Sequence, residues 1–574
     1  MSRHACSPEV RFPDLHRFLA RAATTVGGVL AVGVAFALSA CSSVAEKDAA
    51  GQGDSRVAGD GSASAVSGAL VPATPPATSP LPPAVRFDSS WKSLEQYRCP
   101  EWFRDAKFGI WTCWNPYTVP AIGDWYARDM YVEGSRAYKY HVANYGHPSK
   151  VGYKDIIEMW KGEKFDPEKL VALFKEAGAK YIVAMAAHHD NFDLWNSTHH
   201  EWNSVNHGPR QNIIGKWERA VRNAGLRWGV TSHLERAWNW LGTSKNADKK
   251  GPLAGVPYDG ADPKNAGLYF PNYAGYRDDD MHYAVNPPPP VIVDYARRIK
   301  DLLDQHKPDL FYFDGGVPFG ETGRRLLAYY YNANTAWHGG KLEAVMCIKN
   351  YNNGRYHGDG LRNGIGVPDL ERGQMASISD VPWQTDDSIG DWFWTRNDRY
   401  KTTREMVDLL VDVVSKNGSL LINVPPRADG TLDERAITLL KEIGAWLRIN
   451  GEGIYGTRPH TIFGEGPTVQ RGGYFTARAP LTAKDIRFTT KGDTVFAFVF
   501  GAKTTTPPEL RTVTIRNFAA RNYHKVAKVE LLGTAGELQF TQAPDALHIT
   551  LPATLPCDHA ICLKITPQPP PVPA

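Results

Sequence analysis

Residues 181–192 read Tyr-Ile-Val-Ala-Met-Ala-Ala-His-His-Asp-Asn-Phe, an apolar run that ends abruptly in polar side chains. The seven residues Tyr181–Ala187 carry no charge and no turn former, which is typical of a strand buried on both faces. Such strands occur in parallel sheets that are covered by helices. This stretch therefore predicts an α/β fold with His188 and His189 at the carboxyl end of a strand.

Similar apolar segments recur on both sides of this stretch, and helical patterns separate them. The predicted strands are Phe108–Cys113, Tyr181–Ala187, Arg227–His233, Leu310–Asp314, Glu343–Ile348 and Leu420–Val424. One predicted helix, Pro167–Ala177, follows Asp166 as N-cap, and another, Val291–His306, ends ahead of Pro308. This alternation predicts a (β/α)8-like TIM barrel over residues 86–456. A doubly wound open sheet is the alternative.

The pattern changes after Tyr455 to short alternating strands. Asp485–Thr490 and Thr494–Phe500 flank the turn Lys491-Gly492-Asp493, which is typical of a hairpin. We expect an antiparallel β-sandwich over residues 457–568 and a disordered tail over 569–574. Cys557 and Cys562 near the end of the sandwich could form a disulfide or remain two free thiols.

The first 85 residues have the pattern of an export signal and a tether. Arginines precede the apolar stretch Val29–Leu38, which is too short to cross a bilayer, so residues 1–40 are predicted to be a signal peptide. Leu38-Ser39-Ala40-Cys41 resembles a bacterial lipobox, with Cys41 as the lipidated residue. Residues 41–85 are rich in Ala, Gly, Ser and Pro and predict a disordered linker. We expect an exported, periplasmic or cell-surface protein, anchored to the outer membrane by lipid.

The composition excludes some classes of partner. A formal charge of +4 is small for 574 residues, and no long basic run is present, so nucleic acid is not an expected partner. The seven cysteines include no Cys-x-x-Cys pair, which disfavours a zinc site built from thiolates. The 17 tryptophans and 25 tyrosines fill the core, but they also offer flat faces on which sugar rings stack.

Polar clusters at the predicted strand ends are the candidates for a site. Asp314 follows the apolar run Leu310–Phe313 and precedes two glycines, which suits a nucleophile that a substrate must approach closely, or a loop-capping aspartate. The pair His188 and His189 could bind a metal, bind hydroxyl groups or be structural. Further candidates are Cys113 with Trp114, Asp124 with Trp125, and His233 with Trp238.

Several ordered segments resemble the α-L-fucosidases of glycoside hydrolase family 29. They include Trp102-Phe103-Arg104-Asp105-Ala106-Lys107-Phe108-Gly109-Ile110-Trp111, Gly123-Asp124-Trp125-Tyr126, His188-His189-Asp190-Asn191-Phe192, Asp314-Gly315, Trp383-Gln384-Thr385-Asp386-Asp387, and Leu421-Ile422-Asn423-Val424-Pro425-Pro426. The resemblance covers about residues 100 to 460. It implies an exo-acting retaining enzyme without a cofactor or metal, whose substrate is a fucosylated glycan.

The resemblance also implies roles for individual residues. Asp314 is the expected nucleophile, and His188, His189, Trp125 and Asp124 are expected to line the fucose pocket. Trp114 or Trp238 could cover the methyl-bearing face of the sugar, with His233 at the end of the neighbouring strand.

Two positions depart from the family pattern. Gln384 stands where many members have glutamate, so we expect Glu371 to be the general acid/base, with Glu343, Asp386 and Glu235 as alternatives. Cys113 replaces a histidine and is a poorer donor to a sugar hydroxyl. These departures leave two other functions open: an exo-glycosidase for an L-galactose-like sugar, and a non-catalytic surface lipoprotein that binds glycans.

Overall fold

The computed structural model describes residues 86–273, 287–349, 364–501 and 511–569. The predicted signal peptide, the lipobox with Cys41, the linker and all but the first residue of the predicted tail lie outside these ranges. Within them, no helix combines the length and the apolar character that crossing a bilayer requires.

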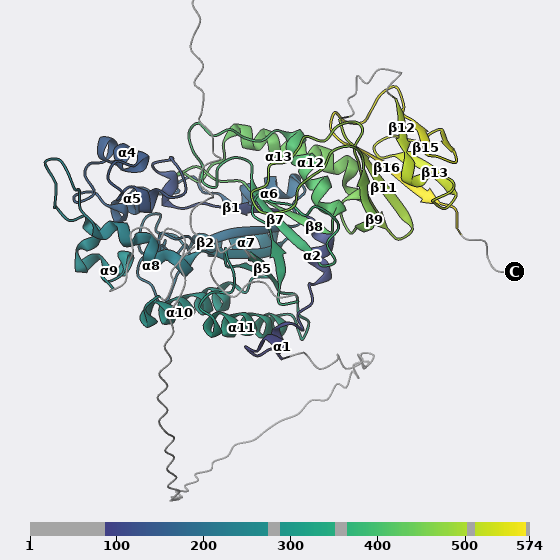
Figure 1. Cartoon of the computed structure of the whole chain (residues 1–574). Coiled ribbons are helices and arrows are strands. Elements are labelled where there is room, and N and C mark those ends of the chain that lie inside the picture. The colour runs from purple at the N-terminus through teal and green to yellow at the C-terminus, as the bar shows by residue number, and fades with distance from the viewer. Residues whose placement is uncertain (1–85, 274–286, 350–363, 502–510, 570–574) are drawn as a thin grey trace, which may run out of the picture. The chain divides into compact units, whose positions relative to one another are not determined.

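Eight parallel strands form a closed barrel in sequential order, with β1 paired to β8 (Figure 1). The strands are β1 (Phe108–Thr112), β2 (Tyr181–Ala187), β3 (Arg227–Ser232), β4 (Leu310–Tyr312), β5 (Val345–Lys349), β6 (Val367–Asp369), β7 (Trp383–Ser388) and β8 (Gly418–Asn423). The predicted TIM-like barrel is confirmed, and the open-sheet alternative is wrong because the first and last strands hydrogen-bond to each other. β6 and β7 were absent from the predicted strands.

Helices surround the barrel, and several begin with the caps that their sequences predict. Asp166 accepts a hydrogen bond from the Lys169 amide at the start of α6, and Pro167 occupies the first turn. The α-helices are α1 (Trp91–Leu94), α2 (Glu101–Ala106), α3 (Tyr126–Asp129), α4 (Arg136–Asn144), α5 (Tyr153–Met159), α6 (Pro167–Glu176), α7 (Ile213–Asn223), α8 (Ala237–Trp240), α9 (Ala266–Tyr269), α10 (Pro289–His306), α11 (Glu321–Trp337), α12 (Thr403–Ser415) and α13 (Glu434–Asn450). Neighbour contacts run α11, α10, α7, α6, α13, α12 around the outside.

The barrel interior is filled by side chains rather than open. The Tyr181 ring crosses above Gly109, where any Cβ would lie only 2.4 Å from the ring, so β1 needs glycine at this position. The hydroxyl of Tyr181 donates to Gln384 Oε1 of β7 at 3.2 Å. Every residue of β7 is buried although most of them are polar. The lower barrel is therefore a packed plug, and a site can open only above it.

Residues beyond α13 form two antiparallel sheets. One has the order β13-β16-β11-β10-β9 and the other β12-β15-β14. Their strands are β9 (Arg458–Glu465), β10 (Ile486–Lys491), β11 (Thr494–Val499), β12 (Thr512–Ile515), β13 (Val526–Leu531), β14 (Phe540–Gln542), β15 (Leu547–Thr550) and β16 (Ile561–Pro567). The predicted hairpin is present, with Lys491 paired to Thr494. An apolar cluster drawn from both sheets forms a second core, as expected for a sandwich.

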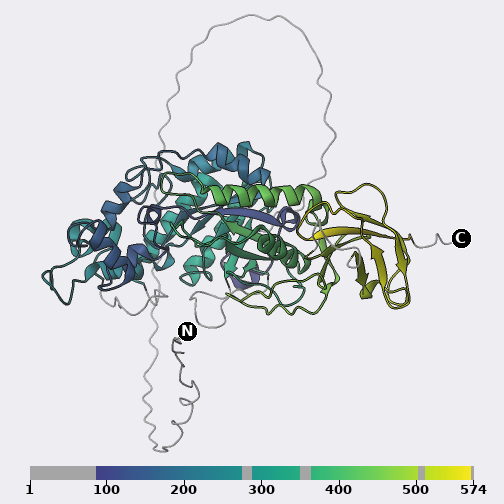
Figure 2. The ribbon, with the colours of Figure 1, turned by 90° about the horizontal axis from the view of Figure 1, so that it is seen from above.

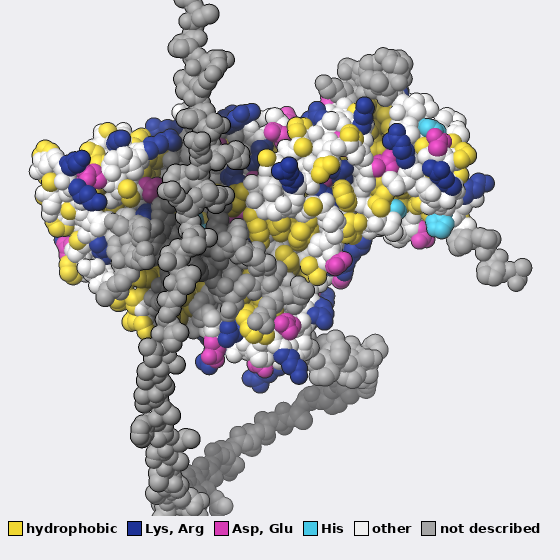
Figure 3. All heavy atoms as spheres, in the orientation of Figure 1, with side chains coloured by type: hydrophobic (Ala, Val, Ile, Leu, Met, Phe, Trp, Pro, Cys, Tyr) yellow, Lys and Arg dark blue, Asp and Glu magenta, His cyan; other side chains and the backbone are white. Residues whose placement is uncertain are grey.

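The larger sheet packs against the helices on one side of the barrel (Figure 1 and Figure 2). Arg487 of β10 donates to Asp412 of α12 at 2.7 Å, and Trp446 of α13 donates to the Ala560 carbonyl at 2.6 Å. Cys557 and Cys562 are free thiols in this structure. On the face shown in Figure 3, basic and acidic side chains are interspersed, in keeping with the small net charge.

Candidate active site

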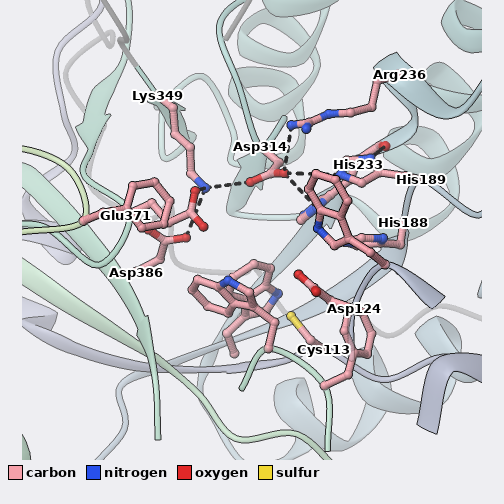
Figure 4. Close-up of a pocket in the computed structure, with 15 residues that line it drawn as sticks. Cys113, Asp124, His188, His189, His233, Arg236, Asp314, Lys349, Glu371 and Asp386 are labelled. Carbon is pink, nitrogen blue, oxygen red and sulfur yellow. Dashed lines mark hydrogen bonds and ion pairs between the residues drawn. The ribbon is translucent and has the colours of Figure 1, made fainter. Parts of the chain in front are cut away.

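A pocket opens at the carboxyl ends of the barrel strands (Figure 4). The strand-end residues meet there because parallel strands of a barrel all end at the same rim. The pocket is lined by Trp111, Cys113, Asp124, Trp125, His188, His189, His233, Arg236, Asp314, Lys349, Glu371, Asp386, Trp392, Phe393 and Phe475.

Asp314, two residues beyond the end of β4, occupies the centre of this pocket and lies close to Lys349, Arg236 and His233 (Figure 4). Its Oδ1 accepts a hydrogen bond from Lys349 Nζ at 2.6 Å, and its Oδ2 lies 3.1 Å from His233 Nδ1 and 3.7 Å from Arg236 Nη2. Burial alone would raise the pKa of Asp314, but His233, Lys349 and Arg236 together hold that pKa well below its usual range. The carboxylate is therefore ionised at neutral pH, as a nucleophile must be.

The backbone of Asp314 is unusual as well. Its φ of 62° lies in the left-handed region, which few residues other than glycine, asparagine and aspartate adopt readily. Arg372, next to Glu371, also has a left-handed φ of 45°. Backbone strain of this kind clusters at functional sites, where the surrounding packing maintains it.

Lys349, the last residue of β5, joins the two candidate catalytic carboxylates. Its ammonium group donates to Asp314 Oδ1 at 2.6 Å and to Glu371 Oε2 at 2.8 Å, and lies 3.4 Å from Asp386 Oδ2 (Figure 4). The sum of these two hydrogen-bond lengths, 2.6 and 2.8 Å, is therefore an upper limit for the distance between Asp314 Oδ1 and Glu371 Oε2. Two carboxyl groups whose nearest oxygens are this close fit the spacing of about 5–5.5 Å in retaining glycosidases better than the roughly 6.5–9.5 Å of inverting ones.

Asp386 lies deeper than Glu371 and is fully buried. The hydroxyl of Tyr312 is 2.7 Å from Asp369 Oδ2 and 3.1 Å from Asp386 Oδ2. One hydroxyl has only one proton to donate, so the second contact requires a proton on a carboxyl group. Burial, followed by the charge of Asp369, raises the pKa of Asp386 well above its usual range. Burial therefore favours the protonated form of Asp386.

His188 and His189 both face the pocket as neutral imidazoles. Burial, with the nearby charges of His233 and Arg236, lowers the pKa of each well below 6.5. His189 Nδ1 lies 2.6 Å from the His233 carbonyl oxygen, which can only accept, so Nδ1 carries the proton. Nε2 of His189 is then a free acceptor 4.0 Å from Asp314 Oδ2, and can receive a hydrogen bond from a sugar hydroxyl.

Among the described residues, one group of side chains has the spacing of metal ligands. Nitrogens of His188, His189 and His233 all lie within 4.8 Å of one another. Three histidines with an open fourth position can bind zinc. The same nitrogens also suit three sugar hydroxyls.

Asp124 and Trp125 line the pocket as predicted from the sequence. Burial raises the pKa of Asp124 to about 7, so this carboxyl can donate or accept hydrogen bonds near neutral pH. Trp125 packs edge-on against Trp240 with ring centroids 4.5 Å apart. The Cys113 thiol is fully buried at the end of β1, and burial raises its pKa well above its usual range, so it is neutral.

Two tryptophans predicted to contact the sugar lie elsewhere. Trp114 points away from the pocket: its indole donates to the Arg427 carbonyl at 2.7 Å and packs against Trp160, because consecutive residues at a strand end face opposite sides. Trp238 also does not line the pocket. Two residues further along the short helix α8, Trp240 instead contacts His189, with ring centroids 4.6 Å apart.

The alternatives to Glu371 occupy different places. Glu343 accepts a hydrogen bond from Arg227 at 2.8 Å just before the start of β5, at the opposite end of the barrel from the pocket. Glu235 does not line the pocket, although burial raises its pKa to about 8. Gln384 is fully buried and donates to Asp369 at 2.9 Å inside the barrel. Of the candidates for the general acid/base, Glu371 and Asp386 line the pocket.

The pocket residues that were not predicted from the sequence include Lys349, Arg236 and Phe475. Lys349 ends an apolar strand and Arg236 ends the one-turn 3-10 helix Leu234–Arg236, so neither position has a recognisable pattern. Phe475 comes from the segment between β9 and β10, more than 100 positions after Glu371, and only the folded chain brings the two together.

Comparison with known proteins supports both parts of the fold. The model of the family described as alpha-L-fucosidase matches residues 78–452, and that of the alpha-L-fucosidase C-terminal domain matches residues 480–566. Tissue alpha-L-fucosidase of Rattus norvegicus is 28% identical over 498 residues, covering 84% of this chain and 92% of that protein. The human tissue enzyme is 27% identical over 499 residues, covering 84% and 92%.

Solved structures agree. The Thermotoga maritima alpha-fucosidase in complex with a mechanism-based inhibitor has a TM-score of 0.64 and 26% identity, covering 84% of this chain and all of that chain. The same enzyme in complex with fucose gives a TM-score of 0.62 and 27% identity, covering 83% of this chain and all of that chain. Because the first family model spans more than half of the sequence, the chain belongs to the alpha-L-fucosidase family.

Proposed function

We propose that the protein is an exo-acting, retaining α-L-fucosidase that removes terminal α-L-fucosyl residues from glycans. The observation that carries this proposal is the pair Asp314 and Glu371, joined through Lys349 within the spacing of a retaining enzyme. Family membership and the structural likeness to enzymes named alpha-fucosidase support the choice of sugar. No cofactor enters the mechanism.

The first half-reaction uses both carboxyl groups. Asp314 Oδ attacks the anomeric carbon of fucose while Glu371 transfers a proton to the glycosidic oxygen, so the bond to the leaving group breaks as the bond to Asp314 forms. His188, His189 and His233, with Asp124, surround the sugar with donors and acceptors for its hydroxyls. The neutral state of His188 and His189 lets each accept as well as donate.

The second half-reaction regenerates the enzyme. Glu371, now a carboxylate, takes a proton from water as the water oxygen attacks the anomeric carbon and Asp314 leaves as a carboxylate. Two inversions give net retention. Lys349 keeps the two carboxyl groups together through both steps, and its charge disfavours a proton on Asp314.

A direct test is nitrophenol release from 4-nitrophenyl α-L-fucoside by the wild type, Asp314→Asn and Glu371→Gln. We expect both variants to lose activity by orders of magnitude, and azide to restore turnover of Glu371→Gln because an anionic nucleophile needs no general base. Asp314→Asn with wild-type activity would rule out the assignment. Circular dichroism checks that both variants are folded.

A related activity on L-galactosides is favoured by one observation. L-galactose carries a hydroxyl on the carbon that is a methyl group in fucose, and the Cys113 thiol is smaller than the histidine of the family pattern and lines the pocket. Comparing kcat/KM for the two nitrophenyl glycosides distinguishes the substrates. A preference for the L-galactoside would replace the fucosidase proposal.

A non-catalytic glycan-binding role is the other alternative. This alternative was suggested by the absence of a carboxyl group at position 384. However, Gln384 lies inside the barrel and does not line the pocket. A binder also has no need of two carboxylates held by one buried lysine. Sugar binding without hydrolysis of any α-L-fucoside would favour this alternative.

We also propose that the mature protein is a lipoprotein, exported and anchored through Cys41 so that the enzyme faces the periplasm or the cell surface. The support is the lipobox-like Leu38-Ser39-Ala40-Cys41 and the linker that follows it. Incorporation of radiolabelled palmitate into the wild type, but not into Cys41→Ala, tests the anchor. A wild type without label would contradict it.

A further inference from the structure

One aromatic ring at the pocket mouth comes from outside the barrel. The segment of residues 466–485, here called the β9–β10 segment, connects two neighbouring strands of the larger C-terminal sheet. It carries Phe475, which lines the pocket and keeps 39% of its surface exposed. Residues 453–479 lie between the regions that match the two family models, so this ring belongs to a part of the chain outside both.

The β9–β10 segment is fixed to the barrel at its tip. Gln374 and Gly473 exchange two backbone hydrogen bonds, of 3.1 and 2.9 Å. Arg478 donates to the buried Asp387 at 2.7 Å and to the Gly373 carbonyl at 3.0 Å. A Cβ on Gly373 would lie 2.2 Å from the Gly473 carbonyl oxygen, so glycine is needed for the two backbones to approach this closely.

The base of the segment is fixed as well. The Asp485 carboxylate accepts hydrogen bonds from the backbone amides and hydroxyls of Thr468 and Thr482, at 2.7 to 2.9 Å. A loop tied at both ends holds its side chains in place, which reduces the entropy lost when one of them binds a ligand.

Phe475 is tied directly to the candidate acid/base. Its amide donates to the Glu371 carbonyl at 3.0 Å, and its φ of 50° lies in the left-handed region, where a phenylalanine is strained. Phe475 therefore lines the pocket beside Glu371, whereas His188, His189 and His233 lie on the far side of the pocket from Glu371 (Figure 4). A ring on the Glu371 side lies where the leaving group must be, since Glu371 protonates the leaving oxygen.

We propose that Phe475 forms the leaving-group subsite, where its ring stacks on the apolar face of the pyranose to which the fucose is attached. A flat, partly exposed ring suits the C–H face of a pyranose, which makes no demand on hydrogen-bond donors. This inference rests on the proposed function, because the leaving-group side is defined by the role of Glu371. The enzyme should thus prefer fucose linked to another sugar over fucose with a small leaving group.

Three substrates separate the subsite from the fucose pocket. α-L-Fucosyl fluoride has no ring in its leaving group, 4-nitrophenyl α-L-fucoside has an aromatic ring, and α-L-fucosyl-(1→2)-galactose has a pyranose. For Phe475→Ala we expect kcat/KM to fall about tenfold on the disaccharide, as loss of a contact of about 1.4 kcal/mol would give. Activity on the fluoride should stay within about twofold of wild type.

Alanine keeps a Cβ, so the left-handed backbone at position 475 is no less strained in the variant than in the wild type. Phe475→Trp should retain activity on the disaccharide because it keeps a flat ring. Val469→Ala is the matched control, since Val469 lies in the same segment, is 80% exposed and does not line the pocket. It should leave all three substrates unaffected.

Because fluoride leaves with little help from a general acid, a residue that only positions Glu371 would also spare the fluoride. A loss on the disaccharide that Phe475→Trp shares, or that comes with a displaced alkaline limb of the pH profile, would mean that Phe475 only positions Glu371, and would overturn the subsite. An equal loss on all three substrates would overturn it as well. Unchanged kinetics on the disaccharide would overturn it too. If the wild type cleaves none of the three fucosides, the proposed function itself fails and the subsite fails with it. If the wild type cleaves the fluoride and Phe475→Ala shows no discrimination, the subsite alone fails.

Discussion

Lys349→Met removes a positive charge that contacts both candidate catalytic carboxylates. The side chain is 1% exposed and its ammonium contacts Asp314 and Glu371 at 2.6 and 2.8 Å. At an effective dielectric constant of about 20, a unit charge about 4 Å from a carboxylate contributes about 4 kcal/mol. Water and Arg236 would offset part of this loss, so we take roughly 2–3 kcal/mol as the net effect on the ionisation of Asp314, or about two pH units at about 1.4 kcal/mol per unit.

The expected result is an upward displacement of the pH profile. Lys349 favours the ionised form of Asp314, so its removal raises the pH at which Asp314 loses its proton, and the acidic limb of kcat/KM moves to higher pH by about two units. The assay is kcat/KM for 4-nitrophenyl α-L-fucoside across the pH range that the folded variant tolerates. Lys349→Arg keeps the charge and serves as the matched control, with limbs close to those of the wild type. A Met variant with a normal melting temperature and an unchanged profile would refute the reasoning.

Three further predictions follow from the same pocket. Cys113→His restores a stronger hydrogen-bond donor and should lower KM for the fucoside by roughly tenfold, or about 1.4 kcal/mol; an unchanged KM would mean that position 113 contacts no sugar hydroxyl. Asp386 has a raised pKa in the folded state, so it destabilises the protein increasingly as pH rises above its unfolded pKa of about 3.9. Asp386→Asn should therefore raise Tm at pH 7, and the gain in Tm should shrink towards pH 4. A gain in Tm that does not depend on pH would contradict a buried proton on Asp386. Zn²⁺ should bind the three pocket histidines and inhibit the enzyme in competition with fucose, and His233→Phe should weaken this inhibition. EDTA alone should not reduce turnover. Inhibition by Zn²⁺ that fucose does not relieve would place the metal elsewhere.

The strands of the barrel could be predicted from the sequence where they consist of consecutive apolar residues. β2 appears in the sequence as seven consecutive apolar residues, and its predicted bounds agree with the structure. β7 contains Gln384, Thr385, Asp386 and Asp387, all buried, and was missed because hydropathy cannot identify a strand whose buried side chains are polar and bond to other segments. β6 has only three residues and gives too short a pattern to recognise.

The site was predictable to the extent that its residues follow recognisable strands. Cys113, His188, His189, His233 and Asp314 come at or just after predicted strand ends, and the structure places all of them in the pocket. Trp114 and Trp238 were chosen for their chemistry without knowledge of which way they face. Lys349 and Phe475 could not be found from the sequence, since their roles depend on contacts made only in three dimensions.

Trapping the covalent intermediate tests whether Asp314 is the nucleophile of a retaining reaction. The wild type would be incubated with 2-deoxy-2-fluoro-α-L-fucosyl fluoride, whose electron-withdrawing fluorine at C2 slows hydrolysis of the intermediate, and then analysed by mass spectrometry of the intact protein and its peptides. We expect the added mass of one 2-deoxy-2-fluorofucosyl group, located on Asp314 and absent from Asp314→Asn. A label on another residue, or turnover of 4-nitrophenyl α-L-fucoside with inverted product, would contradict it.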